Sequence, residues 1–229
     1  MKKLKFCVIG LGYFGYNLSL YLTELGAEVI SIDNREDVIE NIKDKVDLAV
    51  VMDSTDLKAL KNLGIEDIDA VIVAIGEDFE GSINTIANLQ EIGVKKIIAR
   101  SISSIHQRLL KLMNIDQVIL PEAEAAKHLS NKLIIPNIFD YIELDNNYAI
   151  FECKVPNIFV GKKLLEVNLR QNYDLNLVTI KRNQTKGIFK KTVENSIIGI
   201  PTPDYVFQEQ DILVIFGTKS KIKSFLNSI

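Results

Sequence analysis

A glycine-rich turn near the amino terminus carries residue types and a spacing suited to chemistry. The apolar segment 4–9 leads into three glycines spaced G-x-G-x-x-G, and a helical pattern follows. The first glycine permits the tight turn, the second lets the backbone approach a pyrophosphate, and the third lets the helix pack closely on the strand. The N-terminus of the helix directs free N–H groups and the positive end of its dipole at the phosphates. The predicted nucleotide-binding turn comprises Gly10, Gly12, Tyr13, Phe14 and Gly15.

A carboxylate follows this turn at a sequence spacing suited to binding a ribose. Segment 28–32 is a second apolar strand, and it ends in Asp33, 18 residues after Gly15. In dinucleotide-binding folds an acid about 20 residues on accepts hydrogen bonds from the ribose. We therefore predict that Asp33 holds a ribose, with Asn34 beside it. The alternative is a plain glycine-rich turn, but the flanking strand and helix and the acid at the next strand end favour a nucleotide site.

Further polar or small residues stand where later strands end. Ligands of open α/β sheets collect at the carboxyl ends of strands, so residues there are binding candidates. For Asp53 we favour nucleotide contact over helix capping, and for Ser54 an ordinary N-cap is equally compatible. Arg100 would face a phosphate or pair with a carboxylate, and the sequence does not decide between them. The candidates from these strand ends are Asp53, Ser54, Ala74, Ile75, Gly76 and Arg100.

The elements that must position these residues alternate between strand and helix. Six strands separated by helical patterns predict an α/β fold with a Rossmann-like doubly wound parallel sheet. The uninterrupted apolar run at 70–75 fits a strand that is covered on both faces. The expected strands are 4–9, 28–32, 48–52, 70–75, 96–100 and 117–120, and the expected helices include 34–45, 80–92 and 104–113.

The pattern changes after residue 121. A helix with Ala123, Ala126, Leu129 and Leu133 leaves the sheet and ends before Pro136. Segment 137–141 is then expected to be a hinge, or alternatively a surface loop. Beyond it we expect a smaller α+β module, so that residues 1–139 and 140–229 form two domains. Its expected strands are 149–155, 175–180 and 211–217, with 190–192 a further candidate, and its expected helices are 162–168 and 219–227.

The amino-acid composition excludes some classes of protein function. The 229 residues are 47% hydrophobic, and 27 basic against 30 acidic residues leave a net charge of −3. This balance gives no electrostatic case for nucleic acid. Cys7 and Cys153 lie in apolar strands and are expected to be core residues, because neither has a metal-type spacing. No apolar run approaches the ~18 residues of a membrane span, so we expect a cytosolic protein.

Catalytic chemistry has no convincing candidate in the sequence. A dehydrogenase needs a proton donor near its nicotinamide, but His106 and His128 are both expected to be structural. No cluster has zinc spacing, and no Walker-type phosphate loop is present. We therefore expect a non-enzymatic nucleotide sensor, and keep a small NAD(P)-dependent oxidoreductase as the alternative.

The order of these motifs resembles RCK domains, the regulators of potassium conductance. The resemblance covers essentially the whole chain and is greatest for the regulatory subunit of Ktr/Trk-type bacterial potassium uptake systems. It implies cytoplasmic homodimers, assembled into an octameric ring, which lie peripherally under a membrane-embedded potassium channel subunit and gate it. The segments that carry the resemblance are 8–15, 32–33, 53–56, 71–76 and 119–122 in the first lobe, and 161–162, 168–170 and 210–217 in the second.

The resemblance also implies ligands. ATP and ADP compete for the Rossmann site in this family, whereas some relatives bind NAD(H). By position, Asp53 and Ser54 would lie beside the adenine. Glu122 would help a divalent cation such as Mg²⁺ bridge to the phosphates, or alternatively be a first-turn helix carboxylate. ATP-responsive relatives often carry arginine where this chain has Tyr13, so NAD(H) stays a rival ligand.

In some family members the C-lobe dimer binds cyclic di-AMP. An arginine beside asparagines on an apolar shelf suits a phosphate flanked by a base, but a plain dimer interface would use much the same residues. The matching positions are Leu164, Asn168, Arg170, Asn176 and Pro201.

Overall fold

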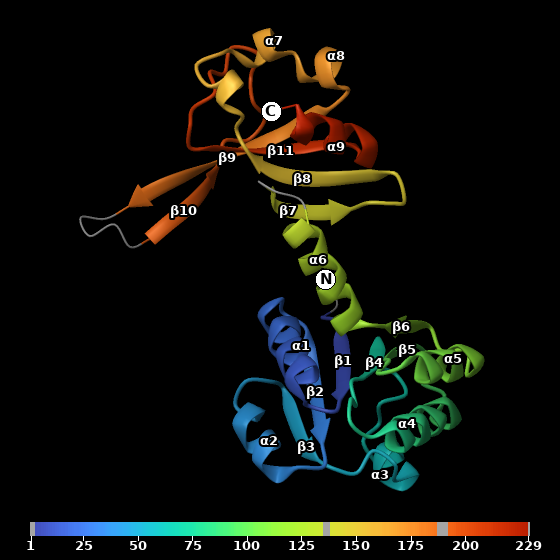
Figure 1. Ribbon diagram of the computed structural model, residues 1–229. Helices are drawn as coiled ribbons and strands as arrows, with labels where there is room; N and C mark the ends of the chain where they lie inside the picture. Colours follow the sequence, from blue (N-terminus) through green and yellow to red (C-terminus); the bar gives the residue numbers. More distant parts are fainter. Residues whose placement is uncertain (1–2, 135–137, 187–191, 229) are drawn as a thin grey trace. The chain divides into compact units, whose positions relative to one another are not determined.

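The chain folds into two compact units, Met1–Ala123 and Glu124–Ile229 (Figure 1). The computed structural model describes residues 3–134, 138–186 and 192–228, without the side chains of 183–195. Each unit contains its own sheet and its own hydrophobic core.

The first unit is a six-stranded parallel sheet in the order β3-β2-β1-β4-β5-β6. The strand order reverses between β1 and β4, which is where an open α/β sheet binds its ligand. This order confirms the predicted Rossmann-like, doubly wound sheet. The strands are β1 (Lys5–Ile9), β2 (Glu28–Asp33), β3 (Leu48–Val51), β4 (Ala70–Val73), β5 (Ile97–Arg100) and β6 (Gln117–Ile119). The helices are α1 (Tyr13–Glu24), α2 (Glu36–Ile42), α3 (Leu57–Asn62), α4 (Phe79–Ile92) and α5 (Ser104–Leu112).

Both faces of this sheet are buried. On β1, Cys7 and Ile9 belong to one core cluster and Val8 to the other, because successive side chains of a strand point to opposite faces. Residues of α3, α4 and α5 complete the first cluster, and residues of α1 and α2 the second. The burial of Cys7 confirms it as a core residue. Because all six strands are parallel, their carboxyl ends lie at the same edge of the sheet.

The second unit is a five-stranded antiparallel sheet in the order β10-β9-β11-β8-β7. Aromatic side chains fill its core, where Phe159 contacts both Phe207 and Phe225, and Cys153 is buried as expected. The smaller α+β module is therefore confirmed. Its strands are β7 (Ile138–Glu143), β8 (Tyr148–Lys154), β9 (Asn176–Lys186), β10 (Thr192–Ile197) and β11 (Asp211–Thr218). The helices are α6 (Pro121–Ile134), which begins in the first unit, η1 (Asn157–Phe159), α7 (Leu164–Val167), α8 (Leu169–Tyr173) and α9 (Lys219–Asn227).

The predicted hinge or loop at 137–141 is wrong. Residues 138–141 are the first part of β7, which pairs with β8, whereas residue 137 lies outside the described residues. The pairing register shifts between Ile138 and Asp140, and this irregularity interrupts the alternation that would have revealed a strand. The candidate strand 190–192 falls almost entirely outside the described residues, and β10 begins at Thr192. Pro136, the predicted end of the preceding helix, also lies outside them.

Candidate nucleotide site

The glycine turn between β1 and α1 is built against the end of β4. Gly10 has φ +90°, and a Cβ on it would lie 2.9 Å from the backbone nitrogen of Ile75. A Cβ on Gly15 would overlap the carbonyl oxygen of Gly10. These two glycines are therefore required by the fold itself. A Cβ on Gly12, in contrast, would meet nothing within 4 Å, so the turn is open at the position expected to face a pyrophosphate.

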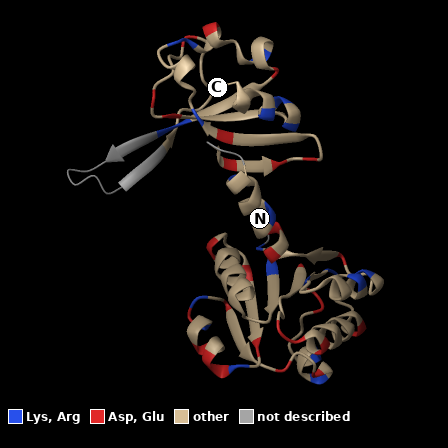
Figure 2. Ribbon diagram, in the orientation of Figure 1, with Lys and Arg blue, Asp and Glu red and all other residues tan. Residues whose placement is uncertain are grey.

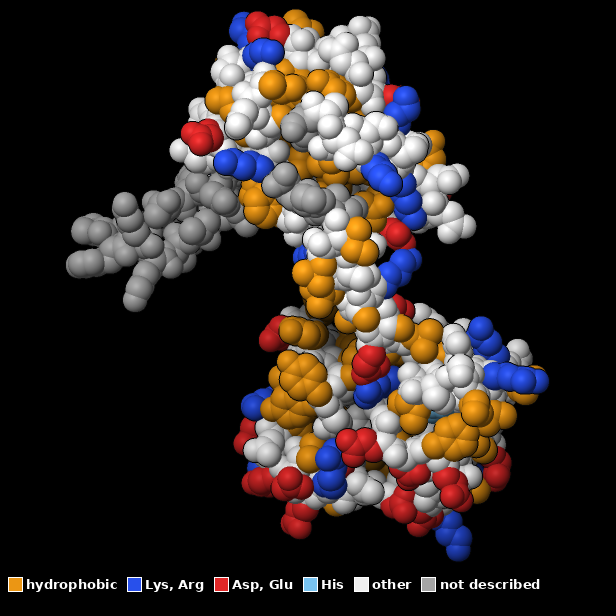
Figure 3. Space-filling model, in the orientation of Figure 1, with side chains coloured by type: hydrophobic (Ala, Val, Ile, Leu, Met, Phe, Trp, Pro, Cys, Tyr) orange, Lys and Arg blue, Asp and Glu red, His pale blue; other side chains and the backbone are white. Residues whose placement is uncertain are grey.

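The N-terminus of α1 has the electrostatic character of an anion site. Gly12 is its N-cap and offers no side-chain hydrogen bond, and the first turn contains no acidic residue. The free N–H groups and the helix dipole therefore favour an anion here. Tyr13 is 91% exposed, whereas Phe14 packs against the core cluster of α1 and α2. Figure 3 shows the hydrophobic side chains exposed over α1.

Asp33, the last residue of β2, is brought directly to this turn. Its Oδ2 accepts a 2.7 Å hydrogen bond from the backbone N–H of Leu11, inside the glycine turn. The guanidinium of Arg35 also pairs with it, with Nε 2.8 Å from Oδ1. Burial opposes ionisation of the carboxyl group, but the hydrogen bonds from Arg35 and Leu11 outweigh burial and hold the pKa of Asp33 below its ordinary value. Asp33 is therefore an ionised acceptor at the site.

Arg35 and the backbone N–H of Leu11 are parts of this arrangement that the sequence does not predict. The only signal was a cation two residues after the strand-end acid. Neighbouring Asn34 is exposed. Figure 2 shows further acidic residues over α2 and near α3 and α4.

Asp53 and Ser54 lie after β3 and make contacts with their own surroundings. Oδ1 of Asp53 accepts hydrogen bonds from the backbone N–H and the hydroxyl of Thr55, which lower the pKa of Asp53. The hydroxyl of Ser54 is buried and lies 2.7 Å from that of Thr85 on α4. The N-cap of α3 is Asp56, whose side chain accepts from two backbone N–H groups. Contact of Asp53 and Ser54 with adenine stays a prediction.

Ala74, Ile75 and Gly76 lead from β4 toward the glycine turn and toward Arg100. Ala74 donates a 2.7 Å hydrogen bond to the carbonyl of Ile9, which holds the ends of β4 and β1 together. Gly76 leaves room for the guanidinium of Arg100, because a Cβ there would lie 2.7 Å from Nη1. Arg100 pairs with Glu122 in the first turn of α6.

The structure thus shows the carboxylate pairing, which was one of the two alternatives for Arg100. Its Nε is buried and has no hydrogen-bond partner. This nitrogen retains donor capacity at the strand edge, and a phosphate contact stays a prediction.

The candidate metal ligand Glu122 stands without a cluster of further ligands in the part of the chain that the structure describes. Among the residues that the structure describes, no group of three or more His, Cys, Asp or Glu side chains could hold one. Glu122 is 63% exposed in its side chain and is engaged with Arg100. This carboxylate could contribute one ligand to a cation that phosphate oxygens also hold.

The residues predicted to bind cyclic di-AMP in the second unit are only partly brought together. Arg170 on α8 donates a 2.9 Å hydrogen bond to Asn176 at the start of β9. Asn168, between α7 and α8, adopts a left-handed conformation with φ 44° and bonds to Gln171. Leu164 donates its backbone N–H to Tyr205, in the loop after Pro201. The structure places no direct hydrogen bond between Asn168 and Arg170.

Two domain families match this chain. The TrkA-N domain matches residues 6–121, and the TrkA-C domain matches residues 149–229. The Ktr system potassium uptake protein C of Bacillus subtilis (strain 168) is 35% identical over 225 residues, which cover 98% of this chain and 96% of that protein.

One solved structure shares the fold of nearly the whole chain, and another shares the fold of part of it. The GsuK RCK domain aligns with a TM-score of 0.63 at 20% identity, over 99% of this chain and 47% of that one, so this chain spans about half its length. The NAD(P)-binding domain of an exopolyphosphatase-related protein from Archaeoglobus fulgidus aligns with a TM-score of 0.51 at 26% identity, over 58% of this chain and 98% of its own.

None of the helices within 3–134, 138–186 and 192–228 is long and apolar enough to cross a membrane. Both domain matches, together with the identity to the Bacillus protein over nearly all of each chain, confirm the resemblance to RCK domains. The chain therefore belongs to the family that combines TrkA-N and TrkA-C domains, and it is homologous to potassium uptake proteins of the Ktr and Trk systems.

Proposed function

We propose that this chain is a cytoplasmic regulatory subunit that senses a nucleotide and gates a membrane-embedded potassium uptake channel or transporter. One observation carries the proposal. The glycine turn and Asp33 are joined by the Leu11 hydrogen bond at the ligand edge of the sheet, in a homologue of Ktr potassium uptake proteins. The chain would act through binding alone.

ATP and ADP are the proposed ligands, with NAD(H) as the rival. Backbone N–H groups at Gly12 and the start of α1 would hold phosphates, and Asp33 would accept hydrogen bonds from the ribose. Glu122 would share a divalent cation such as Mg²⁺ with phosphate oxygens. NAD(H) is supported by Tyr13 in the position where ATP-responsive relatives carry arginine, and by the fold shared with the Archaeoglobus NAD(P)-binding domain.

The proposed assembly is a homodimer that builds an octameric ring beneath the membrane subunit. The first unit would serve as the nucleotide-binding lobe and the second as the dimerisation lobe, and the predicted boundary after residue 139 falls inside β7 of the second unit. A ligand moves the ring toward one shape only by its difference in affinity for the two shapes. A tenfold preference is worth about 1.4 kcal/mol per site. Several sites must therefore act together to change the state of the channel.

A regulatory role is supported over the oxidoreductase alternative by the state of the reactive side chains. Burial raises the pKa of Cys153 to about 12 and also raises that of Cys7, so neither is a ready thiolate. His106 is buried against Phe79 on α4, and burial lowers its pKa. His128 faces Asp140. Steady oxidation of NADPH or NADH by the purified protein with carbonyl substrates would support the oxidoreductase instead.

A second ligand, cyclic di-AMP, is proposed for the C-lobe. The support is the Arg170–Asn176 pair, which places a cation beside an amide at the start of β9. Titration calorimetry with cyclic di-AMP should show binding that Arg170→Ala weakens. If these residues instead form only a dimer interface, the substitution will change dimerisation and no heat of binding will appear.

The nucleotide proposal is tested by mass spectrometry of the small molecules that copurify with the protein, followed by calorimetry with ATP, ADP and NADH. At least one of the three should bind. Potassium uptake by cells that lack the protein should recover with the wild-type gene, and recover less with Asp33→Ala. Absence of binding by all three nucleotides would overturn the proposal.

A further inference from the structure

Asp33 already has its full complement of hydrogen bonds in this structure. Oδ1 accepts from the backbone N–H of Arg35 at 3.0 Å and from its Nε at 2.8 Å. Oδ2 accepts from the backbone N–H of Leu11 at 2.7 Å and from Arg35 Nη2 at 3.0 Å. A carboxylate offers about four acceptor positions, two on each oxygen. All four are filled, and the side chain is only 4% exposed.

We infer that Arg35 is a latch on the ribose-binding carboxylate, so that ribose hydroxyls bind Asp33 only after they displace the Arg35 guanidinium. This inference rests on the proposed nucleotide site and adds to it a residue that sets the affinity. The guanidinium places one N–H on each carboxylate oxygen. A ribose diol can offer the same pair of donors, one hydroxyl to each oxygen, so the two compete for the same acceptor positions.

The remaining two hydrogen bonds would stay in place during this exchange. Both come from backbone N–H groups, those of Leu11 in the glycine turn and Arg35 at the N-cap of α2. They hold the carboxylate toward the site whether or not the guanidinium is bound. Only the side chain of Arg35 has to move, so the exchange leaves the turn itself intact.

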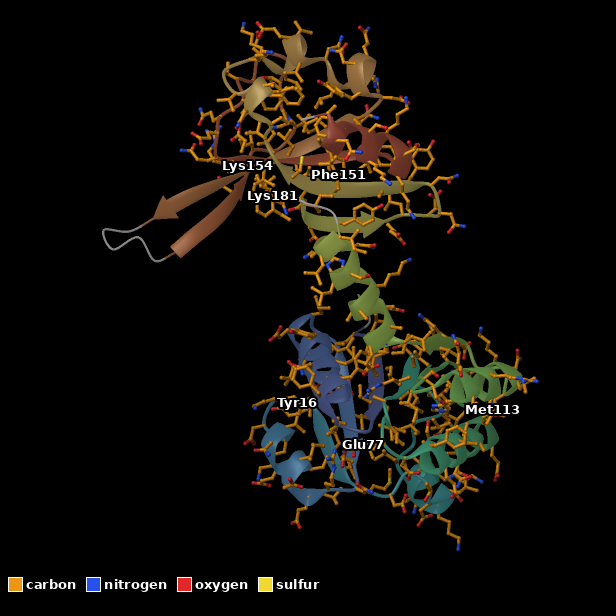
Figure 4. All side chains as sticks on the ribbon, viewed as in Figure 1. Tyr16, Glu77, Met113, Phe151, Lys154 and Lys181 are labelled. Carbon is orange, nitrogen blue, oxygen red and sulfur yellow. The ribbon has the colours of Figure 1, made fainter. Side chains whose placement is uncertain are left out.

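The surroundings of Arg35 allow this movement. Its side chain is 54% exposed, so it can leave Asp33 for water without crossing packed atoms. The hydrogen bond with Asp33 raises the pKa of Arg35, and the charges of Asp37 and Glu77 raise it further. Figure 4 places Glu77 at the edge of the sheet just beyond β4. These two carboxylates give the released guanidinium alternative partners on the same edge.

The latch lowers the affinity for every ligand that uses its ribose diol. A half-exposed ion pair of this kind is expected to reduce affinity about fivefold. Calorimetry with ADP should therefore show a dissociation constant about fivefold lower for Arg35→Ala than for wild type. Arg108→Ala is the matched control, because it removes an exposed arginine on α5, away from Asp33, and should leave ADP affinity unchanged.

Two further measurements identify the mechanism. Arg35→Ala should not tighten binding of 2′,3′-dideoxy-ADP, which has no ribose hydroxyls to compete for Asp33. In an Asp33→Ala background the same substitution should have no effect on ADP, because a latch acts only through its carboxylate. Arg35→Gln, which removes the charge and keeps a polar side chain, should also tighten ADP binding and serves if Arg35→Ala fails to fold.

The outcomes separate the latch from the nucleotide site. ADP binding to wild type with unchanged or weaker binding to both folded Arg35 variants would overturn the latch alone. Equal tightening of ADP and dideoxy-ADP would also overturn it, since Arg35 would then act by general charge. No ADP or NADH binding to wild type or to either variant would overturn the nucleotide site and the latch together.

Discussion

Replacing Asp33 with alanine tests the candidate site directly. Each ribose hydroxyl that donates to this ionised carboxylate would form a charge-assisted hydrogen bond worth about 1.5–3 kcal/mol. Displacement of the half-exposed Arg35 guanidinium offsets about 1 kcal/mol of this gain. With both hydroxyls engaged, a net contribution of about 2–5 kcal/mol remains. We therefore expect Asp33→Ala to weaken adenine-nucleotide binding at least about tenfold, which corresponds to about 1.4 kcal/mol.

The assay is calorimetry with ADP and NADH, with thermal denaturation to confirm that each variant is folded. Asp47→Ala is a suitable control. Asp47 also accepts a backbone N–H, from Val29 at 2.9 Å, and pairs with a lysine, but it precedes β3 and so lies at the opposite edge of the same sheet. Its loss should leave nucleotide affinity unchanged. Wild-type affinity in a folded Asp33→Ala variant would remove Asp33 from the site and refute the reasoning.

Three other outcomes follow from the same contacts. Gly15→Ala should destabilise the fold by at least about 2 kcal/mol in chemical denaturation, because the added Cβ overlaps the Gly10 carbonyl. Gly12→Ala, in contrast, should unfold like wild type but bind phosphates more weakly. The pKa of Asp33 is lower in the folded state than its unfolded value of about 3.9, so its contribution to stability should be constant above pH 3.9. That contribution should disappear as the pH falls through the folded-state pKa. The difference in unfolding free energy between wild type and Asp33→Ala should therefore vanish in acid. Tyr13→Arg should raise the preference for ATP over ADP in competition binding, and an unchanged ratio would mean that this position does not contact the γ-phosphate.

The turn and the sheet were predictable from the sequence because both depend on residue type and spacing. Gly10 has a positive φ, and Gly15 has no room for a Cβ, so both positions require glycine. The residue type at each position therefore reveals the requirement directly. The continuous apolar run of β4 likewise marks a strand that is buried on both faces. These local requirements sufficed to place the strand ends on one edge.

Side-chain pairings were harder to predict, because they depend on rotamers and on neighbours distant in sequence. The Ser54 hydroxyl meets Thr85, 31 positions away, and Arg35 turns back onto Asp33 instead of pointing outward from α2. The strand β7 was missed for a related reason, since its irregular pairing with β8 breaks the period of two. Local periodicity contains no information about such partners.

The crowding around Gly10 and Gly15 has an evolutionary consequence. Any side chain at either position would push against backbone atoms of the turn or of the neighbouring strand, so variants there would lose the fold before they could change the ligand. Gly12 and Tyr13 face open space, and substitutions at these two positions are sterically tolerated. We therefore expect changes of ligand preference within this turn to arise at Gly12 and Tyr13, because substitutions at Gly10 and Gly15 would disrupt the fold.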